Sequence, residues 1–272
     1  YSPARVAKGD NSSNVVERAI EYWNGEEGKR GIVTLCWHWC PAARYDKSKS
    51  DPWGTFYTDK TKFNLARALN GSDPDGYQML LDDIDAIAVQ LKRLQDADVP
   101  VLWRPLHEAS GGWFWWGASG ADAYLQLYKL MYDRLTNVHG LNNLIWVWNG
   151  QDAAWYPGDE YVDIIGEDIY PGKHVYTSQA ARFIKALSYT DTRKLITLSE
   201  NGCIPDPEQL VRDNIMWSYW CVWEGEFVLK AAGFNNYSEQ YTEKNMLKKA
   251  YKSDTVITRK ELPDLRNYPL GD

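Results

Sequence analysis

Two glutamates that follow short apolar runs are the residues of this sequence best placed to do chemistry. Glu108 lies in the stretch WRPLHEASGGWFWWG (103–117), and Glu200 lies in ITLSENG (196–202). Two carboxyl groups at one cavity can hydrolyse a glycosidic bond, one as the proton donor and the other as the nucleophile at the anomeric carbon. A lone glutamate at a strand end is as readily a surface ion pair, so the hypothesis depends on the pairing.

A run of four aromatic residues, Trp113–Trp116, follows Glu108 almost directly. Such rings can fill a core, but Gly111 and Gly112 in the same stretch are typical of a loop, and aromatic residues on loops commonly face a ligand. The whole chain holds 14 Trp and 18 Tyr against 6 Phe, a bias toward rings that stack on sugars and carry a polar group. We expect Trp113 to project over a cleft, while residues 114–116 divide between its wall and the packing beneath.

Six short runs rich in β-branched and aromatic residues are predicted to be strands, each followed by polar residues. Most are apolar throughout, which is typical of parallel strands covered on both faces. They are residues 31–39, 99–108, 143–150, 161–171, 194–202 and 216–223. Glu108 and Glu200 therefore both lie near the carboxyl ends of strands.

Helical patterns separate these runs. Residues 77–95 carry an apolar stripe at helical spacing that begins at Tyr77 and ends at Leu94. Residues 121–135 and 178–187 behave similarly, with Ser178 as the expected N-cap of the second. The alternation of strands and helices without a linker predicts a single α/β domain over residues 1–272. Polar residues at the ends of all strands describe the active-site edge of a (β/α)8 TIM barrel.

The composition argues against several classes of partner. A net charge of -7 disfavours nucleic acid, whose phosphates require clustered basic residues. No apolar run approaches the roughly 20 residues of a membrane-spanning helix, and no signal segment begins at Tyr1. No glycine-rich nucleotide-binding motif follows a strand. A neutral polymer remains compatible with this composition, whereas nucleic acid and a membrane are not expected as partners.

The cysteines show none of the spacings typical of zinc sites, so buried free thiols and a disulfide both remain open. They are Cys36, Cys40, Cys203 and Cys221. Three Asn-X-Ser motifs would accept glycans only in a eukaryotic secretory route. They begin at Asn11, Asn70 and Asn236.

Three motifs together resemble glycoside hydrolase family 26, the β-mannanase family of (β/α)8 barrels: WRPLHEASGGWFWWG, GEDIYPG (166–172) and LSENG (198–202). The first is very specific, and the resemblance extends over nearly the whole chain. It implies that the two glutamates follow strands four and seven of the barrel. It also implies that YSPARV (1–6) follows strand two, so strands one and two are expected to lie upstream of Tyr1.

Carried over residue by residue, the resemblance makes Glu108 the acid/base and Glu200 the nucleophile of a retaining enzyme. His107 would orient and tune the site, and Trp113 would be a sugar platform beside the cleaved bond. Four further residues would contact the substrate or hold the nucleophile. They are His38 on the glycone side, Asp168 as a polar contact, Tyr170 as the phenol that holds Glu200, and Trp223 as an aromatic floor.

The implied protein is an endo-β-1,4-mannanase that cleaves mannan, glucomannan or galactomannan. It is expected to be secreted or extracellular, and a place at a cell surface or in a multi-enzyme complex is compatible with this. We expect a monomer that needs no metal and no organic cofactor. The motifs identify the machinery more firmly than the sugar, so a mixed-linkage β-glucanase and a β-1,3-xylanase stay alternatives. A non-catalytic carbohydrate-binding barrel is disfavoured, because both glutamates are present together with His107 and Tyr170. The long segment 41–75 is expected to extend the sugar-binding sites or to block one end.

Overall fold

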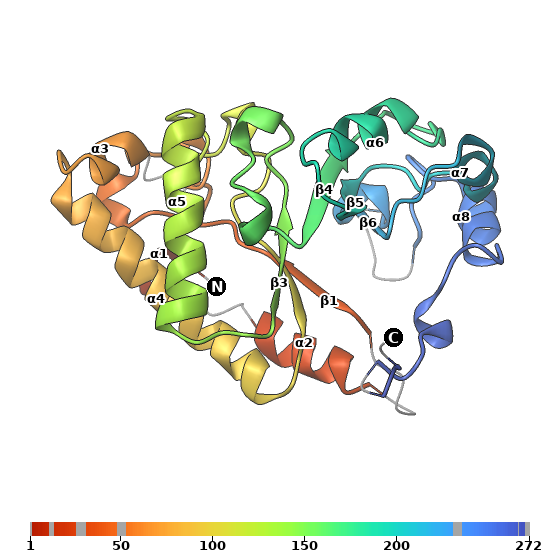
Figure 1. Ribbon diagram of the computed structural model, residues 1–272, viewed down its shortest axis with the longest axis horizontal. Coiled ribbons are helices and arrows are strands. Elements are labelled where there is room, and N and C mark those ends of the chain that lie inside the picture. The colour runs from red at the N-terminus through yellow and green to blue at the C-terminus, as the bar shows by residue number, and fades with distance from the viewer. Residues whose placement is uncertain are drawn as a thin grey trace. The chain divides into compact units, whose positions relative to one another are not determined.

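The computed structural model describes residues 2–10, 14–25, 31–47, 53–230, 236–265 and 267–269. They divide into two compact units, Tyr1–Asp163 and Ile164–Asp272. Each unit contains parallel strands with helices beside them, labelled in Figure 1. The α/β class is therefore confirmed, while the single domain over residues 1–272 stays a prediction.

The strands of the first unit pair in parallel in the order of the chain. They are β1 (Val33–Cys36), β2 (Val101–Arg104) and β3 (Leu144–Trp148). Val101 lies opposite Val33 on one side and opposite Leu144 on the other, so the strands begin level with one another. Their carboxyl ends consequently lie at one edge of the sheet, which is where residues 37–39, 105–108 and 149–150 leave it.

The helices of the first unit are α1 (Pro3–Ala7), α2 (Val15–Trp23), α3 (Leu65–Leu69), α4 (Pro74–Asp96) and α5 (Ala121–Asp133). The long helix α4 begins at a clear start signal, because Pro74 occupies its first turn and the Asp73 side chain accepts a hydrogen bond of 2.9 Å from the Gly76 N–H. The expected stripe on α4 is buried at Leu80, Ile84, Ile87, Ala88, Leu91 and Leu94, whereas Leu81 is half-buried and Tyr77 in the first turn is 38% exposed.

Tryptophan dominates the core of the first unit. Among its described residues, eight indoles are at most 4% exposed: Trp23, Trp37, Trp39, Trp103, Trp115, Trp116, Trp146 and Trp148. Trp37 and Trp39, which follow β1, stack nearly parallel with ring centroids 4.3 Å apart. Trp39 also donates a hydrogen bond of 2.6 Å from its indole N–H to the buried carboxyl group of Asp83 on α4. This bond ties the segment after β1 to α4.

The second unit repeats the parallel arrangement. Its strands are β4 (Ile164–Ile169), β5 (Leu195–Asn201) and β6 (Trp220–Val222), and its helices are α6 (Ala180–Leu187), α7 (Pro207–Asp213) and α8 (Lys244–Tyr251). The register of β4 against β5 shifts between Glu167 and Asp168. This irregularity brings Asp168 level with Glu200.

All six predicted strands are present in the described part of the chain, each shorter than its apolar run. The closed barrel and the two strands upstream of Tyr1 stay predictions. The four cysteines, all among the described residues, are thiols not joined in disulfides; Cys40 and Cys203 are buried, and Cys36 and Cys221 are half-buried. Within the residues that the structure describes, no helix combines the length and the apolar character needed to cross a membrane.

The predicted N-cap of α6 is wrong. Gln179, not Ser178, occupies the capping position, with a left-handed φ of 56°. The hydroxyl of Ser178 donates instead to the carboxylate of Asp213 at the end of α7. A tertiary partner has therefore taken the side chain that local sequence rules assign to the helix end.

The buried Asp83 predicts a pH-dependent stability. Burial raises the pKa of Asp83 from 3.8 to about 7, although the indole N–H of Trp39 acts in the opposite direction. The unfolded chain thus releases this proton near pH 4 and the folded chain only near pH 7, so the free energy of unfolding falls as pH rises through this range. Each pH unit of difference corresponds to about 1.4 kcal/mol, so the loss is on the order of a few kcal/mol.

Asp83→Asn, which keeps an oxygen for the Trp39 N–H, is expected to remove this contribution. Urea unfolding of both proteins between pH 4 and 8 measures it, with the exposed Asp96→Asn at the end of the same helix as the control. If the stability difference between Asp83→Asn and the parent does not change with pH, Asp83 does not titrate in this range.

Candidate active site

Glu108 lies in a backbone conformation that side chains rarely adopt. Its φ is 53°, as is that of Leu106 two residues earlier, so the chain enters the left-handed region twice just after β2. Such conformations cost on the order of 1 kcal/mol or more and persist only where surrounding contacts enforce them. The turn brings the half-buried carboxyl group of Glu108 out at the carboxyl end of the sheet.

Asn149, the first residue after β3, enforces this turn. The Glu108 N–H donates to the Asn149 carbonyl oxygen at 2.7 Å and approaches its side-chain oxygen at 3.3 Å. The same side-chain oxygen accepts a bond of 3.0 Å from the guanidinium of Arg104. Asn149 is fully buried and Arg104 is 3% exposed, so both are held rigidly under Glu108.

Trp113 contacts the Glu108 carboxyl group directly. Its indole N–H donates a hydrogen bond of 2.9 Å to Oε2 of Glu108, while 47% of the side chain stays exposed. Two glycines allow this return of the chain. Gly112 has a φ of 71°, and a Cβ at Gly111 would lie 2.0 Å from the Trp113 ring. The expectation that Trp113 projects outward next to the glutamate therefore agrees with the geometry.

The rest of the aromatic run forms the floor behind Trp113. Phe114, Trp115 and Trp116 are each at most 4% exposed to solvent. The indole N–H of Trp116 donates to the carbonyl oxygen of His107 at 2.8 Å, and Phe114 stacks on Trp116 with centroids 4.6 Å apart. The run therefore supplies one exposed ring and three packed rings.

Two histidines lie beneath the glutamate as neutral imidazoles. The rings of His38 and His107 meet edge to face with centroids 4.9 Å apart. Burial, with the positive charge of Arg104 nearby, lowers the pKa of His38 to about 4 and holds the pKa of His107 well below its usual value. Nδ1 of His107 is buried, and no described residue offers it a hydrogen-bond partner. A neutral imidazole nitrogen of this kind can accept or donate a bond without adding charge.

In the second unit, the nucleophile candidate Glu200 is held by a phenol. It lies in β5 with 5% exposure, and the hydroxyl of Tyr170 donates to its Oε2 at 2.6 Å. A hydrogen bond to an ionised carboxylate is among the stronger ones in proteins. It fixes the orientation of the carboxylate.

Asp168 lies beside Glu200 on the neighbouring strand. Its Oδ1 accepts a bond of 2.6 Å from the Ser199 hydroxyl, and it is 6% exposed. Glu167, the preceding residue, points to the opposite face of the sheet, as strand geometry requires. There its fully buried carboxylate accepts bonds from Arg182 of α6 and from the hydroxyl of Tyr189. One carboxylate anchors a helix and the other faces the site edge.

The chain after Glu200 is close-packed. The N–H of Trp223, just beyond β6, donates to the carbonyl oxygen of Asn201 at 3.0 Å. A Cβ at Gly202 would lie 3.2 Å from the ring of Tyr170 and 3.2 Å from that of Phe227. Glycine at position 202 therefore lets the Tyr170 ring lie against the backbone and reach Glu200.

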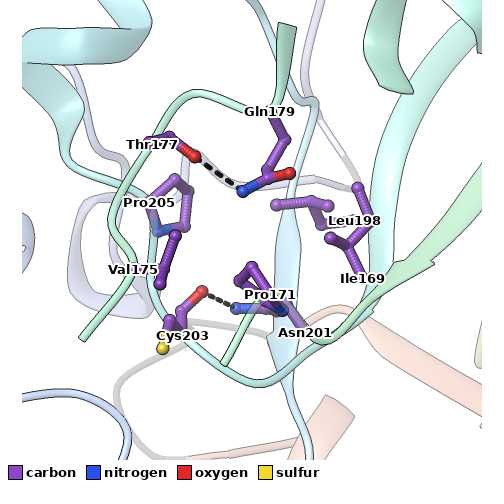
Figure 2. A pocket seen from close by; sticks show the side chains of 9 residues that line it. All are labelled: Ile169, Pro171, Val175, Thr177, Gln179, Leu198, Asn201, Cys203 and Pro205. Carbon is purple, nitrogen blue, oxygen red and sulfur yellow. Dashed lines mark hydrogen bonds between the residues drawn. The ribbon is translucent and has the colours of Figure 1, made fainter. Parts of the chain in front are cut away.

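A small cavity lies behind this segment (Figure 2). Its volume of about 10 Å³ has room for roughly one water molecule. The side-chain N–H of Asn201 donates to the carbonyl oxygen of Cys203 at 2.7 Å, and Gln179 donates to Thr177 at the far side (Figure 2). The cavity is too small for a sugar, so it belongs to the packing behind β5.

The structure thus brings Glu108, His107, His38 and Trp113 together in the first unit, and Tyr170, Asp168 and Glu200 in the second. The separation of the two glutamates, which lie in different units, stays a prediction. Sequence reasoning missed four supporting residues: Arg104, Asn149, Ser199 and Gly202. The available signal was their position at strand ends, in RPLHE, WNG and SENG.

The sequence profile of glycosyl hydrolase family 26 matches residues 1–261. The chain belongs to this family. A relative from Thermothelomyces thermophilus, named mannan endo-1,4-beta-mannosidase, is 46% identical over 263 residues, which are 96% of this chain and 52% of the relative. Mannan endo-1,4-beta-mannosidase A of Piromyces sp is 38% identical over 92% of this chain and 38% of its own length. The family 26 chain thus spans about half or less of these two relatives.

Solved structures of the family agree with the fold. The Podospora anserina GH26-CBM35 beta-(1,4)-mannanase is 40% identical, with a TM-score of 0.85 over 96% of this chain and 56% of the other. A beta-mannanase from a symbiotic protist of the termite Reticulitermes speratus, complexed with gluco-manno-oligosaccharide, is 36% identical, with a TM-score of 0.78 over 93% of this chain and 73% of the other. The parallel α/β architecture is therefore that of family 26.

The contrast between exposed and buried tryptophans predicts different effects on stability. Trp116→Ala empties a fully buried site and removes the bond to His107, so we expect a loss of about 3 to 5 kcal/mol in the free energy of unfolding. Trp113→Ala removes a half-exposed ring, and its cost is expected to stay below about 1 kcal/mol. Urea unfolding of both variants measures this, and a larger loss for Trp113→Ala would reverse the assignment of platform and floor.

Proposed function

We propose that the protein that carries this chain is an endo-acting glycoside hydrolase that cleaves β-1,4-mannosidic bonds with retention of configuration. In this proposal Glu108 is the acid/base and Glu200 is the nucleophile. The observation that carries it is the bond from the Tyr170 hydroxyl to Glu200, because a phenol that donates to a strand-end carboxylate in a family 26 chain suits a nucleophile that must stay ionised.

The first step transfers a sugar to the enzyme. Glu200 attacks the anomeric carbon while Glu108 gives its proton to the departing glycosidic oxygen. An indole N–H can only donate, so Oε2 of Glu108, which receives the Trp113 bond, acts as an acceptor, and the acid proton is expected on the other oxygen. Trp113 would then hold the carboxyl group in the orientation that directs its proton toward the bond being cleaved.

The second step releases the sugar. Glu108, now ionised, takes a proton from a water molecule as the oxygen of that water attacks the anomeric carbon and displaces Glu200. Two displacements at one carbon retain its configuration. Both steps require the two carboxyl groups to lie about 5 to 5.5 Å apart. A crystal structure of the full-length protein with a separation beyond about 9 Å would contradict this mechanism.

Substrate contacts are proposed for the residues around the two glutamates. Trp113 offers an exposed indole face for stacking on a sugar ring, and Trp223 is proposed as the floor under the cleaved sugar. His38, His107 and Asp168 would contact sugar hydroxyls, for which neutral imidazoles and a carboxylate are suitable partners. The mannanase names of the relatives support mannan, glucomannan or galactomannan as the polymer. A secreted, monomeric enzyme is part of the same proposal.

Product sizing tests the substrate and the mode of attack. The full-length protein is incubated with galactomannan, glucomannan, mixed-linkage β-glucan and xylan, and the products are separated by length. We expect short oligosaccharides from the two mannans alone, with a rapid fall in polymer length that indicates internal cleavage. Products from β-glucan or xylan alone would assign another polymer, and no product from any of them would leave a carbohydrate-binding role.

Substitution of the two glutamates separates their roles. Glu200→Ala is expected to abolish turnover but keep oligosaccharide binding nearly intact, because the nucleophile acts mainly in the transition state. Glu108→Ala is expected to spare the first step for aryl mannosides with activated leaving groups, which need little protonation. Steady-state and burst kinetics on activated and natural substrates measure both effects. Equal losses on the two kinds of substrate would argue that Glu108 is not the acid.

Gly202→Ala is expected to lower kcat through Tyr170. The added Cβ would lie 3.2 Å from the Tyr170 ring, so the ring must shift by a few tenths of an ångström, which weakens the bond from its hydroxyl to Glu200. Complete loss of a hydrogen bond to a charged group costs about 1.5 to 3 kcal/mol, so this partial weakening is expected to lower kcat by about tenfold or less. Tyr170→Phe removes the hydroxyl without moving the ring, and in that background Gly202→Ala should cost little more. An undiminished additional loss would show that Gly202 acts by another route.

A further inference from the structure

The loop that carries Trp113 is hydrogen-bonded to a segment that lies more than 50 residues earlier in the sequence. Residues 53–62, which we call the clamp segment, contact residues 112–115 through an isolated antiparallel bridge between Tyr57 and Phe114. The N–H of Trp115 donates to the carbonyl oxygen of Phe56 at 3.1 Å. Thr58 makes the other two contacts, one with its N–H and one with its hydroxyl.

The two bonds of Thr58 reach the peptide groups on both sides of Trp113. Its N–H donates to the carbonyl oxygen of Trp113 at 2.7 Å, and its hydroxyl donates to the carbonyl oxygen of Gly112 at 2.9 Å. The Gly112 carbonyl belongs to the peptide group before Trp113, and the Trp113 carbonyl belongs to the one after it. Fixing both planes fixes the φ and ψ of Trp113, and with them the direction of its Cα–Cβ bond.

This restraint matters because Trp113 has little packing around it. The side chain is 47% exposed, whereas its three neighbours in the run are buried. Gly112 adds a flexible joint just before it, with a φ of 71°. An exposed ring after a glycine depends on its backbone for its direction, and this ring must point its N–H at Glu108.

We propose that Thr58 is a positioning residue of the candidate site, which orients Trp113 and through it the carboxyl group of Glu108. The inference rests on the proposed function only for the role of Glu108 as acid/base. Thr58 itself is half-buried, and its carbonyl oxygen accepts a bond of 2.9 Å from Lys47. The clamp segment, which is part of segment 41–75, thus supports the candidate site in addition to any sugar contacts that segment makes.

A spectroscopic test does not depend on catalysis. Two-dimensional NMR of isotope-labelled tryptophan indoles in the full-length protein gives a signal for Trp113, assigned by its loss in Trp113→Phe. Thr58→Val removes the hydroxyl at nearly equal volume, and we expect it to shift or broaden this signal. Thr58→Ser, which keeps the hydroxyl, should restore it. An unchanged Trp113 signal in Thr58→Val would overturn the proposal.

Thr61→Val is the matched control in the same segment. The Thr61 hydroxyl donates to the carbonyl oxygen of Tyr45 at 3.2 Å, and the residue is 3% exposed. We expect this variant to lower the melting temperature without moving the Trp113 signal. If Thr61→Val moves that signal as much as Thr58→Val does, the effect is a general loosening of the clamp segment and the specific role of Thr58 is rejected.

Kinetics link the orientation to the reaction. We expect Thr58→Val to lower kcat/KM on manno-oligosaccharides about tenfold, which corresponds to about 1.4 kcal/mol, and to lower it less on activated aryl mannosides. In a Trp113→Ala background the same substitution should have almost no further effect, because the two residues act in series. Additive losses would contradict the proposal. Should Thr58→Val fail to fold, Thr58→Ala takes its place in each comparison.

An inactive parent protein gives a different pattern. If the parent cleaves no polysaccharide while Thr58→Val still moves the Trp113 signal, the proposed function fails and the positioning role of Thr58 stands. If the parent is active and the signal does not respond to Thr58→Val, the positioning role fails and the proposed function stands.

Discussion

The left-handed turn at Glu108 is the constraint on which the first half of the candidate site depends. Nothing in the preference of a glutamate favours a φ of 53°, so the conformation is imposed by Asn149, whose carbonyl and amide oxygens both face the Glu108 N–H. Asn149 is itself placed by the parallel pairing of β2 and β3 and by Arg104. A carboxyl group presented in this way is fixed by the sheet and not by a mobile loop, which suits a group that must meet a substrate atom at hydrogen-bond distance.

In the second unit, an irregular strand fixes the positions of the carboxyl groups. The register shift after Glu167 sets Asp168 level with Glu200, while the alternation of the strand sends Glu167 to the helix side. Adjacent acidic residues thereby have unrelated tasks: Glu167 is neutralised by Arg182 in the packing, and Asp168 is held by the Ser199 hydroxyl at the site edge. Gly202 then gives the Tyr170 ring the space it needs to reach Glu200. This local arrangement of side chains is consistent with membership of family 26.

Much of the fold, and the position of the two glutamates at or just after strand ends, could be predicted from the sequence, because these signals are local. Apolar runs identify strands, and a polar residue after a parallel strand must lie at its carboxyl edge. The partners of those residues are not local. The hydroxyl of Thr58 meets Gly112 across 54 positions of the chain, and Asn149 meets Glu108 across 41. Ser178 illustrates the same limit, since a carboxylate on α7 draws its hydroxyl away from the helix that it precedes. Such pairings depend on the register of strands and loops, which no short motif encodes.

The stacked pair Trp37 and Trp39 gives this protein an optical property. Two indoles that lie 4.3 Å apart and are tilted by only 9° couple their electronic transitions. Aromatic rings held in fixed, asymmetric packing contribute to the circular dichroism of a protein in the near ultraviolet, and this contribution is lost when the packing is lost. Because Trp39 is hydrogen-bonded to Asp83 of α4, the circular dichroism of this pair depends on whether α4 is packed against the end of β1. The pair is thus an intrinsic spectroscopic probe of the folding of the first unit.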